Sequence, residues 1–234
     1  MLLAAGRGER MRPLTDHTPK PLLPVQGRAL LDWHIAALLR DGVAQVLVNT
    51  AWLGAHIAQH LDATWRGSPL QLRYSHEQDD FGHALETAGG IARALPQLPP
   101  VFWLAAGDVF VPDFVFDPAA HAAFAASADL AHLWLVPNPA HHPQGDFGLA
   151  AGRALNLPAD SPMPRYTYST IGLFKAALFS APWCALAPGN PTGQAAPLAP
   201  LLRRAMDAGR VGASLYTGRW TDVGTPQRWA ELQQ

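Results

Sequence analysis

The residues best suited to chemistry lie near the start of the chain, between positions 3 and 25. Leu3, Ala4 and Ala5 have the character of a buried strand end, and Gly6 and Gly8 then permit a sharp turn with outward-facing backbone N–H groups. Such a turn forms a cradle for phosphate.

Basic side chains accompany this turn. Arg7, Arg10 and Arg12 supply fixed positive charge, and Lys20, which stands between two prolines, is a point charge that can reach the same phosphates. The combination predicts that a nucleotide triphosphate is held here. A basic surface loop without a ligand is the alternative.

Two common nucleotide motifs are excluded by the residues present. A Walker A loop ends in Gly-Lys-Ser/Thr, whereas Gly8 is followed by Glu9 and Arg10. A dinucleotide fingerprint needs a third glycine that opens a helix, but Met11 stands at that position and Pro13 follows closely.

Two aspartates far apart in the sequence stand at predicted strand ends. Asp108 follows a buried strand over 101–104, and Asp222 lies in the string WTDVG. Ligands of open α/β sheets bind at the carboxyl edge of the strands, where the Gly6 turn also belongs, so Asp108 and the turn should meet. A pair of carboxylates suits Mg²⁺, whereas a single aspartate at a strand end is commonly a turn or cap residue.

Hydrophobic periodicity predicts alternating strands and helices. Helices are expected over 31–39, 52–61, 85–95 and 197–208, and strands over 43–48, 70–74, 101–104, 129–136, 147–151, 166–174 and 220–223, with a loop over 158–164. The order indicates an α/β fold with a largely parallel sheet and helices on its faces. We expect one domain, because no repeat or long linker interrupts the pattern.

The composition limits the classes of partner that we expect this protein to bind. The 234 residues are 49% hydrophobic with a net charge of −1, which gives no reason to expect nucleic acid or an anionic membrane as a partner. The single Cys184 excludes an intramolecular disulfide, and no stretch resembles a membrane span or an export signal, so a cytoplasmic location is expected. The 10 histidines are scattered, and the pair His141-His142 is interpreted as solvated polar residues without a metal.

The opening run resembles the signature of the sugar-1-phosphate nucleotidyltransferases, roughly Gly-x-Gly-x-Arg-x-x-Pro-x-Thr followed by Lys-Pro. The matching residues are Gly6, Gly8, Arg10, Pro13, Thr15, Lys20 and Pro21. Within that family, nearly the whole chain looks most like the bacterial N-acetylmuramic acid 1-phosphate uridylyltransferases. The strings that carry this likeness are HTPKPLLPV, AWLGAHI, LETAGGI, HHPQGDFGL and WTDVGT.

The resemblance implies a single-domain, Rossmann-like nucleotidyltransferase with a mixed, mostly parallel central sheet flanked by helices. Residues 1 to about 110 would bind the nucleotide, and residues from about 111 to 234 the sugar. The implied reaction is the Mg²⁺-dependent transfer of a uridylyl group from UTP to N-acetylmuramic acid 1-phosphate, which gives UDP-N-acetylmuramic acid and pyrophosphate in peptidoglycan recycling.

The resemblance also implies roles for individual residues. Lys20 would contact the α-phosphate, Arg10 would hold the departing pyrophosphate, and Asp108 and Asp222 would bind Mg²⁺. The expected nucleotide-binding residues are Leu3, Ala4, Ala5, Gly6, Arg7, Gly8, Thr87, Ala88 and Gly89. The expected sugar-binding residues are Glu77, Glu86, Asp146, Gly148 and Gly172.

Two other functions remain open from the sequence. One is transfer to another sugar 1-phosphate or from another base, for example mannose 1-phosphate with GTP, and the preference for uridine rests on the resemblance alone. The other is a non-catalytic sugar-nucleotide-binding protein, against which the presence of Lys20, Asp108 and Asp222 argues. The expected partners are small molecules, and a monomer is the default expectation.

Overall fold

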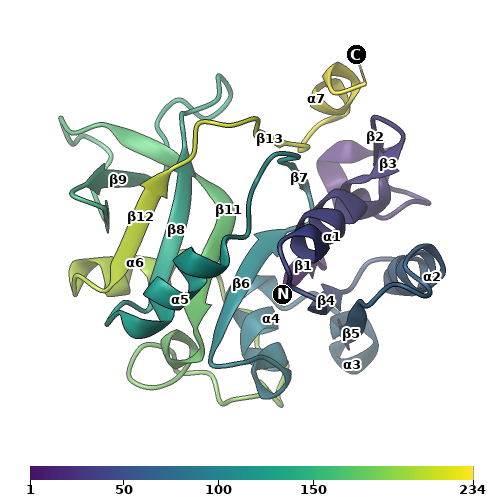
Figure 1. Ribbon diagram of the computed structural model, residues 1–234, viewed down its shortest axis with the longest axis horizontal. Helices are drawn as coiled ribbons and strands as arrows, with labels where there is room; N and C mark the ends of the chain where they lie inside the picture. The colour runs from purple at the N-terminus through teal and green to yellow at the C-terminus, as the bar shows by residue number, and fades with distance from the viewer. Residues whose placement is uncertain (234) are drawn as a thin grey trace.

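A computed structural model describes residues 1–233 of the chain (Figure 1). Within that range, nine strands form the main sheet, and helices cover both of its faces. In spatial order the strands are β5 (Gln71–His76), β4 (Gln45–Thr50), β1 (Leu2–Ala4), β6 (Val101–Ala106), β11 (Arg165–Lys175), β8 (Ala131–Val136), β12 (Val211–Leu215), β10 (Arg153–Leu155) and β9 (Phe147–Ala150).

Helices and two small ribbons complete the architecture. The α-helices are α1 (Leu30–Arg40), α2 (Gly54–Thr64), α3 (Glu77–Phe81), α4 (Glu86–Ala94), α5 (Pro118–Ala126), α6 (Ala199–Asp207) and α7 (Pro226–Glu231). The 3₁₀-helices are η1 (Glu9–Met11), η2 (Lys20–Leu22), η3 (Leu95–Gln97) and η4 (Ala176–Phe179). The ribbons pair β2 (Pro24–Val25) with β3 (Arg28–Ala29), and β7 (Val109–Phe110) with β13 (Thr221–Asp222). None of the helices within residues 1–233 combines the length and apolar character of a membrane span.

The two halves of the main sheet differ in strand direction. β5, β4, β1 and β6 are parallel, as a chain of strands joined by helical crossovers requires. β11 then runs antiparallel to β6 and to β8, and β9 pairs with both β10 and β11, which partly closes this end of the sheet. The sheet is therefore mixed as expected, but the expectation that it is mostly parallel is wrong for the second half, where β9 and β10 are joined by a turn too short for a parallel crossover.

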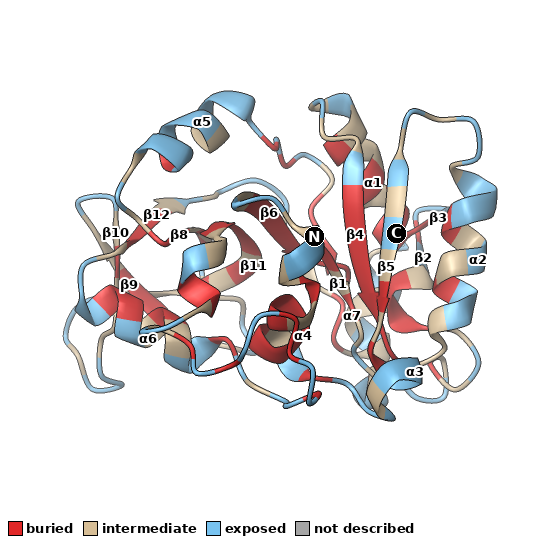
Figure 2. Cartoon of the chain, turned by 90° about the horizontal axis from the view of Figure 1, so that it is seen from below, coloured by how far each residue is buried: buried red, intermediate tan, exposed pale blue. Residues whose placement is uncertain are grey.

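Two large hydrophobic cores lie on opposite faces of the sheet. In β6, Phe102 and Leu104 join the core that contains Ile91 of α4, whereas Trp103 and Ala105 join the core of α1. This alternation follows from the strand's two-residue side-chain period. Buried residues accordingly dominate the central strands β4, β1 and β6 (Figure 2).

Most predicted elements are present with shifted ends. The predicted helices correspond to α1, α2, α4 and α6, and the predicted strands to β4, β5, β6, β8, β9, β11 and β13. The helices α3, α5 and α7 and the strands β10 and β12 were not predicted. In α5, alanines surround the single buried residue Phe124, so the sequence carries little apolar periodicity there.

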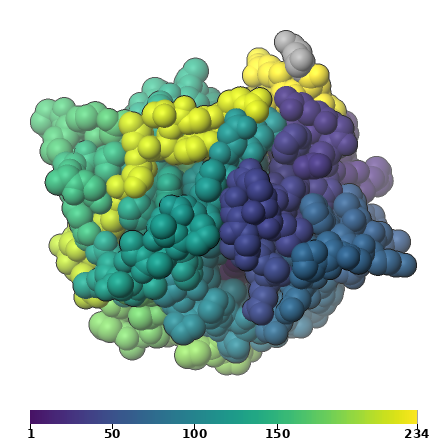
Figure 3. Space-filling model, in the orientation of Figure 1, coloured from purple at the N-terminus to yellow at the C-terminus, as the bar shows by residue number. Residues whose placement is uncertain are grey.

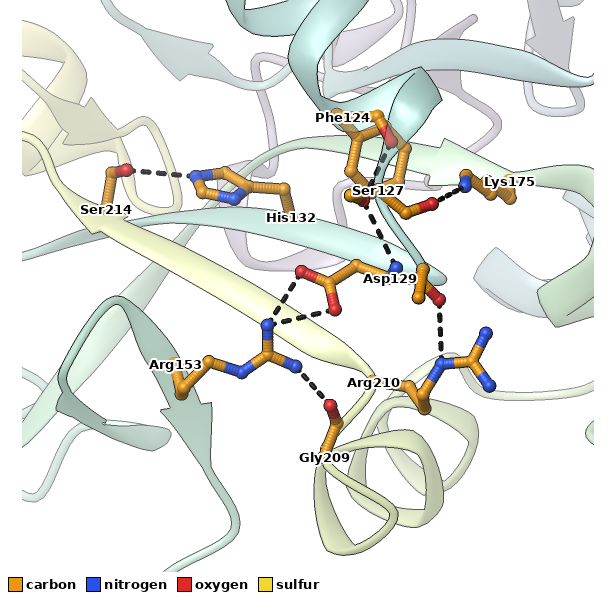
Figure 4. A network of polar contacts seen from close by, with 10 residues as sticks. Phe124, Ser127, Asp129, His132, Arg153, Lys175, Gly209, Arg210 and Ser214 are labelled. Atoms are coloured by element: carbon orange, nitrogen blue, oxygen red, sulfur yellow. Dashed lines mark hydrogen bonds and ion pairs between the residues drawn. The ribbon is translucent and has the colours of Figure 1, made fainter.

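Polar side chains tie the strands at the β8–β12 end of the sheet (Figure 4). Arg153 Nη1 donates to both carboxylate oxygens of Asp129, at 2.9 and 2.7 Å, and His132 Nε2 lies 2.9 Å from Ser214 Oγ. Burial lowers the pKa of His132. These contacts link β10 to the residues just before β8, and β8 to β12.

The C-terminal segment crosses back to the N-terminal half (Figure 3). β13 pairs with β7, and the Val223 N–H donates to the Asp108 carbonyl at 2.9 Å. Further on, Trp229 Nε1 donates to the Pro24 carbonyl at 2.7 Å. The last described segment of the chain thus contacts both Asp108 and the β2–β3 ribbon.

Candidate active site

A cavity of about 740 Å³ opens at the carboxyl ends of β1 and β6. Its size is typical of small-ligand sites, and its position is the edge at which α/β sheets bind ligands. The predicted site residues that line it are Leu3, Ala4, Ala5, Gly6, Arg7, Lys20, Glu86, Thr87, Asp108 and Asp146. Segments from both halves of the sheet therefore meet around one space.

The turn after β1 depends on Gly8. Gly8 has a φ of +67°, and a Cβ at this position would lie 3.2 Å from both Lys20 Cβ and Thr15 Cγ2. Thr15 Oγ1 donates to the Gly8 carbonyl at 2.8 Å, which holds the turn closed. Apart from its chain neighbours, none of the described residues would come within 4 Å of a Cβ on Gly6, so the space beside Gly6 is open to a ligand.

Arg7 is fixed on the cavity wall. Its Nη1 donates to the Thr15 carbonyl at 2.9 Å, and its guanidinium lies 3.7 Å from the centre of the Trp52 ring. Trp52 Nε1 donates to the same carbonyl at 3.0 Å. Stacking and hydrogen bonding thus orient a positive charge beside the glycine turn. The described lining residues do not include the exposed Arg10.

Lys20 and Asp108 form an ion pair at the cavity. Lys20 Nζ lies 2.6 Å from Asp108 Oδ2, and Lys20 as a whole is only 8% exposed. Lys20 begins η2 between Pro19 and Pro21, whose rings restrict the backbone. The ammonium is thus held at the end of β6, although 88 positions separate the two partners.

Asp222 lies beside Asp108 because β13 pairs with β7. Asp222 is opposite Val109 in this ribbon, and the Val223–Asp108 backbone bond continues it. The Asp222 carboxylate contacts Arg228 Nη1 at 3.0 Å and His141 Nε2 at 2.8 Å. The ribbon thus brings the backbone of Asp222 close to that of Asp108, although Asp222 is not among the described lining residues of the cavity.

The adjacent histidines contact two different site carboxylates. His141 Nε2 contacts Asp222, and His142 Nε2 lies 3.1 Å from Asp146 Oδ1. Both rings remain partly exposed. The histidines are thus partly solvated, as interpreted, and each also contacts a carboxylate, a contact that was not predicted from the sequence. The only available sequence signal was the four-residue spacing between His142 and Asp146.

Asp146 lies on the wall that the second half of the sheet contributes. Its Oδ2 accepts a hydrogen bond from the Tyr168 N–H at 2.8 Å, and its carbonyl accepts one from Arg165 Nη2 at 3.0 Å. Tyr168 and Thr170 of β11 line the same wall. Burial raises the pKa of Tyr168, whose hydroxyl has no hydrogen-bond partner among the described residues.

Three predicted sugar-binding residues are not among the described lining residues. Glu77 is fully buried, and its carboxylate accepts hydrogen bonds from Asn49 Nδ2 at 2.6 Å and the Leu85 N–H at 2.7 Å. Burial raises the pKa of Glu77. A Cβ on Gly148 would collide with Leu157, and one on Gly172 would lie 2.8 Å from the Phe174 ring. The two glycines permit close packing at these points.

Ala88 and Gly89 are also buried rather than part of the described lining. Their N–H groups donate to the Ala196 carbonyl at 2.9 and 3.1 Å. A Cβ on Gly89 would lie 2.6 Å from the Gln194 carbonyl oxygen. Both residues thus dock the segment before α6 against α4, and this segment continues into the lining residue Pro197.

Asn49 is a lining residue that the sequence did not single out. Its Oδ1 accepts a hydrogen bond from the Ala4 N–H at 3.0 Å, while its Nδ2 donates to Glu77. The side chain therefore joins β1, β4 and α3 beneath the cavity. The remaining lining residues are Pro21, Ala84, Leu104, Ala106, Phe147, Tyr168, Thr170, Pro197, Leu198, Ala199 and Leu202.

Comparisons with known proteins agree with this architecture. The nucleotidyl transferase family model matches residues 1–154. A relative from Neisseria meningitidis serogroup B, named N-acetylmuramate alpha-1-phosphate uridylyltransferase, is 42% identical over 100% of this chain and 96% of its own length. A protein of the same name from Caulobacter vibrioides is 30% identical over 97% of this chain and 92% of its own length.

Among solved structures, a putative glucose-1-phosphate thymidylyltransferase from Bacillus anthracis superposes with a TM-score of 0.80. That match covers 99% of this chain and 92% of the other, at 17% sequence identity, and it shows the fold. With a family model that matches well over half of the residues and relatives that align along its whole length, this chain belongs to the nucleotidyl transferase family.

Proposed function

We propose that this protein transfers a uridylyl group from UTP to N-acetylmuramic acid 1-phosphate, forming UDP-N-acetylmuramic acid and pyrophosphate. The substrate assignment is supported by the full-length similarity to the two uridylyltransferases of that name. The observation that carries the chemistry is the Lys20–Asp108 pair beside the Gly6–Gly8 turn, at the mouth of a cavity large enough for a nucleotide.

Positioning and charge neutralisation are the main demands of this reaction. The phosphate oxygen of the sugar is already an anion, so it attacks the α-phosphorus without a dedicated general base. The bond from the α-phosphorus to the bridging oxygen breaks, and that oxygen leaves with the pyrophosphate. Lys20 stabilises the charge that develops on the α-phosphate, and Arg7 on the cavity wall holds the departing pyrophosphate. Arg10, which is exposed and outside the described lining, has a role in holding the pyrophosphate only by the resemblance to the family.

Asp108 and Asp222 suit a hard divalent cation. Asp108 lies in the turn before β7 and Asp222 lies on β13, which pairs with β7, and both side chains are partly accessible, at 40% and 27%. Proteins that bind Mg²⁺ through one or two carboxylates leave its other positions to water and substrate phosphates. We therefore propose that these two aspartates hold Mg²⁺, which when bound would neutralise phosphate charge. Lys20 and Arg228 hold the two carboxylates in place.

Each half of the sheet binds one of the two substrates. The base and ribose lie against Leu3, Ala4 and Thr87, where small side chains and backbone groups permit a close approach. The sugar lies on the wall formed by Asp146 and β11, and Glu86 reaches the cavity from the start of α4. The halves therefore act as one catalytic unit, with residues up to about 110 binding UTP.

Pyrophosphate release over a matrix of substrates tests this proposal. UTP, dTTP, GTP and ATP are each paired with N-acetylmuramic acid, N-acetylglucosamine, glucose and mannose 1-phosphates, with Mg²⁺ or with EDTA. We expect Mg²⁺-dependent release confined to UTP with N-acetylmuramic acid 1-phosphate. This release should fall by at least 100-fold in Asp108→Asn, and the surface variant Asp113→Asn should retain it.

Other outcomes separate the alternatives. Preference for a different pair, such as GTP with mannose 1-phosphate, would keep the mechanism and overturn the substrate assignment. Absence of release with every pair, in protein whose folding is shown by a cooperative thermal transition, would favour a sugar-nucleotide-binding protein.

A further inference from the structure

Strand β11 breaks its regular pairing at the cavity wall. Its register against β8 shifts between Tyr168 and Gly172, and Thr170 within this bulge has a φ of +65°. A β-branched residue in the left-handed region is a genuine outlier, since its branched Cβ crowds the backbone there. Glycine would adopt the same conformation freely.

Hydrogen bonds within the protein hold the bulge in place. The Ser169 carbonyl accepts hydrogen bonds from Trp220 Nε1, at 3.0 Å, and from Thr170 Oγ1. The Ile171 N–H donates to Ser169 Oγ at 3.2 Å. Because Trp220 directly precedes β13, the segment that carries Asp222 also fixes the bulge.

The side of the bulge that carries Thr170 lines the cavity. Ile171 is paired with Ala105 of β6, so Thr170 lies near the end of β6, on the same cavity wall as Asp146. Strained backbone conformations persist in proteins chiefly where the side chain or the backbone has a function. Here the hydroxyl donates its hydrogen to Ser169, and its lone pairs remain able to accept a hydrogen bond.

We propose that Thr170 is a specificity-determining residue for the acceptor sugar, and that the β11 bulge exists to present it. Thr170 Oγ1 accepts a hydrogen bond from a hydroxyl or amide hydrogen of the sugar, and its methyl group bounds the space beside that contact. This inference rests on the proposed function, because it assigns Thr170 to the sugar and not to the nucleotide.

The proposal predicts opposite effects on stability and on sugar binding. Thr170→Gly relieves the backbone strain, so its melting temperature should rise by about 2–4 °C. The same change removes the hydroxyl, so the KM for the sugar 1-phosphate should rise by about 3- to 10-fold, while the KM for UTP changes less than twofold.

Two further variants isolate the hydroxyl. Thr170→Val keeps the branched shape and should raise the sugar KM as Thr170→Gly does. Thr170→Ser keeps the hydroxyl and should stay within about twofold of the wild type. Ala151→Gly is the matched control, because Ala151 has a φ of +47° in the exposed β9–β10 turn. It should raise the melting temperature without changing either KM.

The experiment measures both KM values by pyrophosphate release, and the melting temperature of each variant, alongside the substrate matrix. If the wild type is active and the sugar KM is unchanged in Thr170→Gly and Thr170→Val, the role of Thr170 is overturned while the proposed function stands. An equal rise of both KM values would also overturn it, since that result indicates a general disturbance of the site. A wild type inactive with every sugar phosphate would overturn the proposed function and this inference together.

Discussion

His34 makes the stability of this fold depend on pH in a calculable way. It lies in α1, is 2% exposed, and its Nε2 lies 2.9 Å from the Val109 carbonyl, to which a neutral ring donates. Burial lowers the pKa of His34 from 6.5 to about 4, because a charged ring in this position would lose its hydration. The folded protein therefore keeps His34 neutral at pH values at which the unfolded chain protonates it.

The unfolded chain binds the extra proton, so stability falls as the pH falls. The loss begins near pH 6.5, the ordinary value of an exposed histidine, and levels off below about pH 4. With these two pKa values, proton linkage gives a loss of about 2 kcal/mol between pH 8 and pH 5 from His34 alone. This loss is a large fraction of the 5–15 kcal/mol that is roughly typical of folded domains.

Urea denaturation at pH 8, 7, 6 and 5 tests the calculation. His34→Gln keeps an N–H donor for the Val109 carbonyl and cannot titrate, so its free energy of unfolding should fall by about 2 kcal/mol less than that of the wild type over this range. His17→Gln, at an exposed position, should follow the wild type. Parallel curves for the wild type and His34→Gln would refute the conclusion that His34 stays neutral in the fold.

Three further predictions concern side chains around the cavity. Trp52→Leu removes the ring that stacks on Arg7, so the KM for UTP should rise by about 3- to 10-fold with the sugar KM unchanged, as measured by pyrophosphate release. Glu77→Gln replaces an oxygen that accepts a buried hydrogen bond by an amide donor. The free energy of unfolding, measured by urea denaturation, should therefore fall by about 1–3 kcal/mol. The sugar KM should stay within twofold of the wild type. His141→Gln should raise the Mg²⁺ concentration needed for half-maximal activity, whereas His142→Gln should raise the sugar KM; identical effects of the two changes would contradict their separate contacts.

The position of the glycine turn, Lys20 and Asp108 around the cavity could be predicted because the signals there are local. Gly8 at a positive φ and the prolines around Lys20 constrain a short stretch of backbone, and Asp108 follows a strand whose apolar residues are consecutive in the sequence. Such features are set by residues close together in the chain. The parallel order of β5, β4, β1 and β6 follows similarly from alternating strands and helices.

The residues proposed to bind the sugar were harder to predict because their environment depends on tertiary contacts. Glu77 has the chemistry of a sugar ligand, yet its partners, Asn49 and the Leu85 N–H, turn it into a buried link between elements. His141 reaches Asp222 only because β13 returns to β7. Thr170 carries no sequence signal, since a positive φ at a threonine is imposed by the bulge and opposes its intrinsic preference.

The return of the C-terminal segment to the N-terminal half has a consequence during synthesis. Trp229 binds the Pro24 carbonyl across 205 positions of sequence, and Val223 binds the Asp108 carbonyl. During translation, the glycine turn and Asp108 are synthesised before Asp222 and α7. A nascent chain that has not yet been extended to β13 therefore lacks Asp222. The ribbon that brings Asp222 beside Asp108 can form only after β13 has been synthesised.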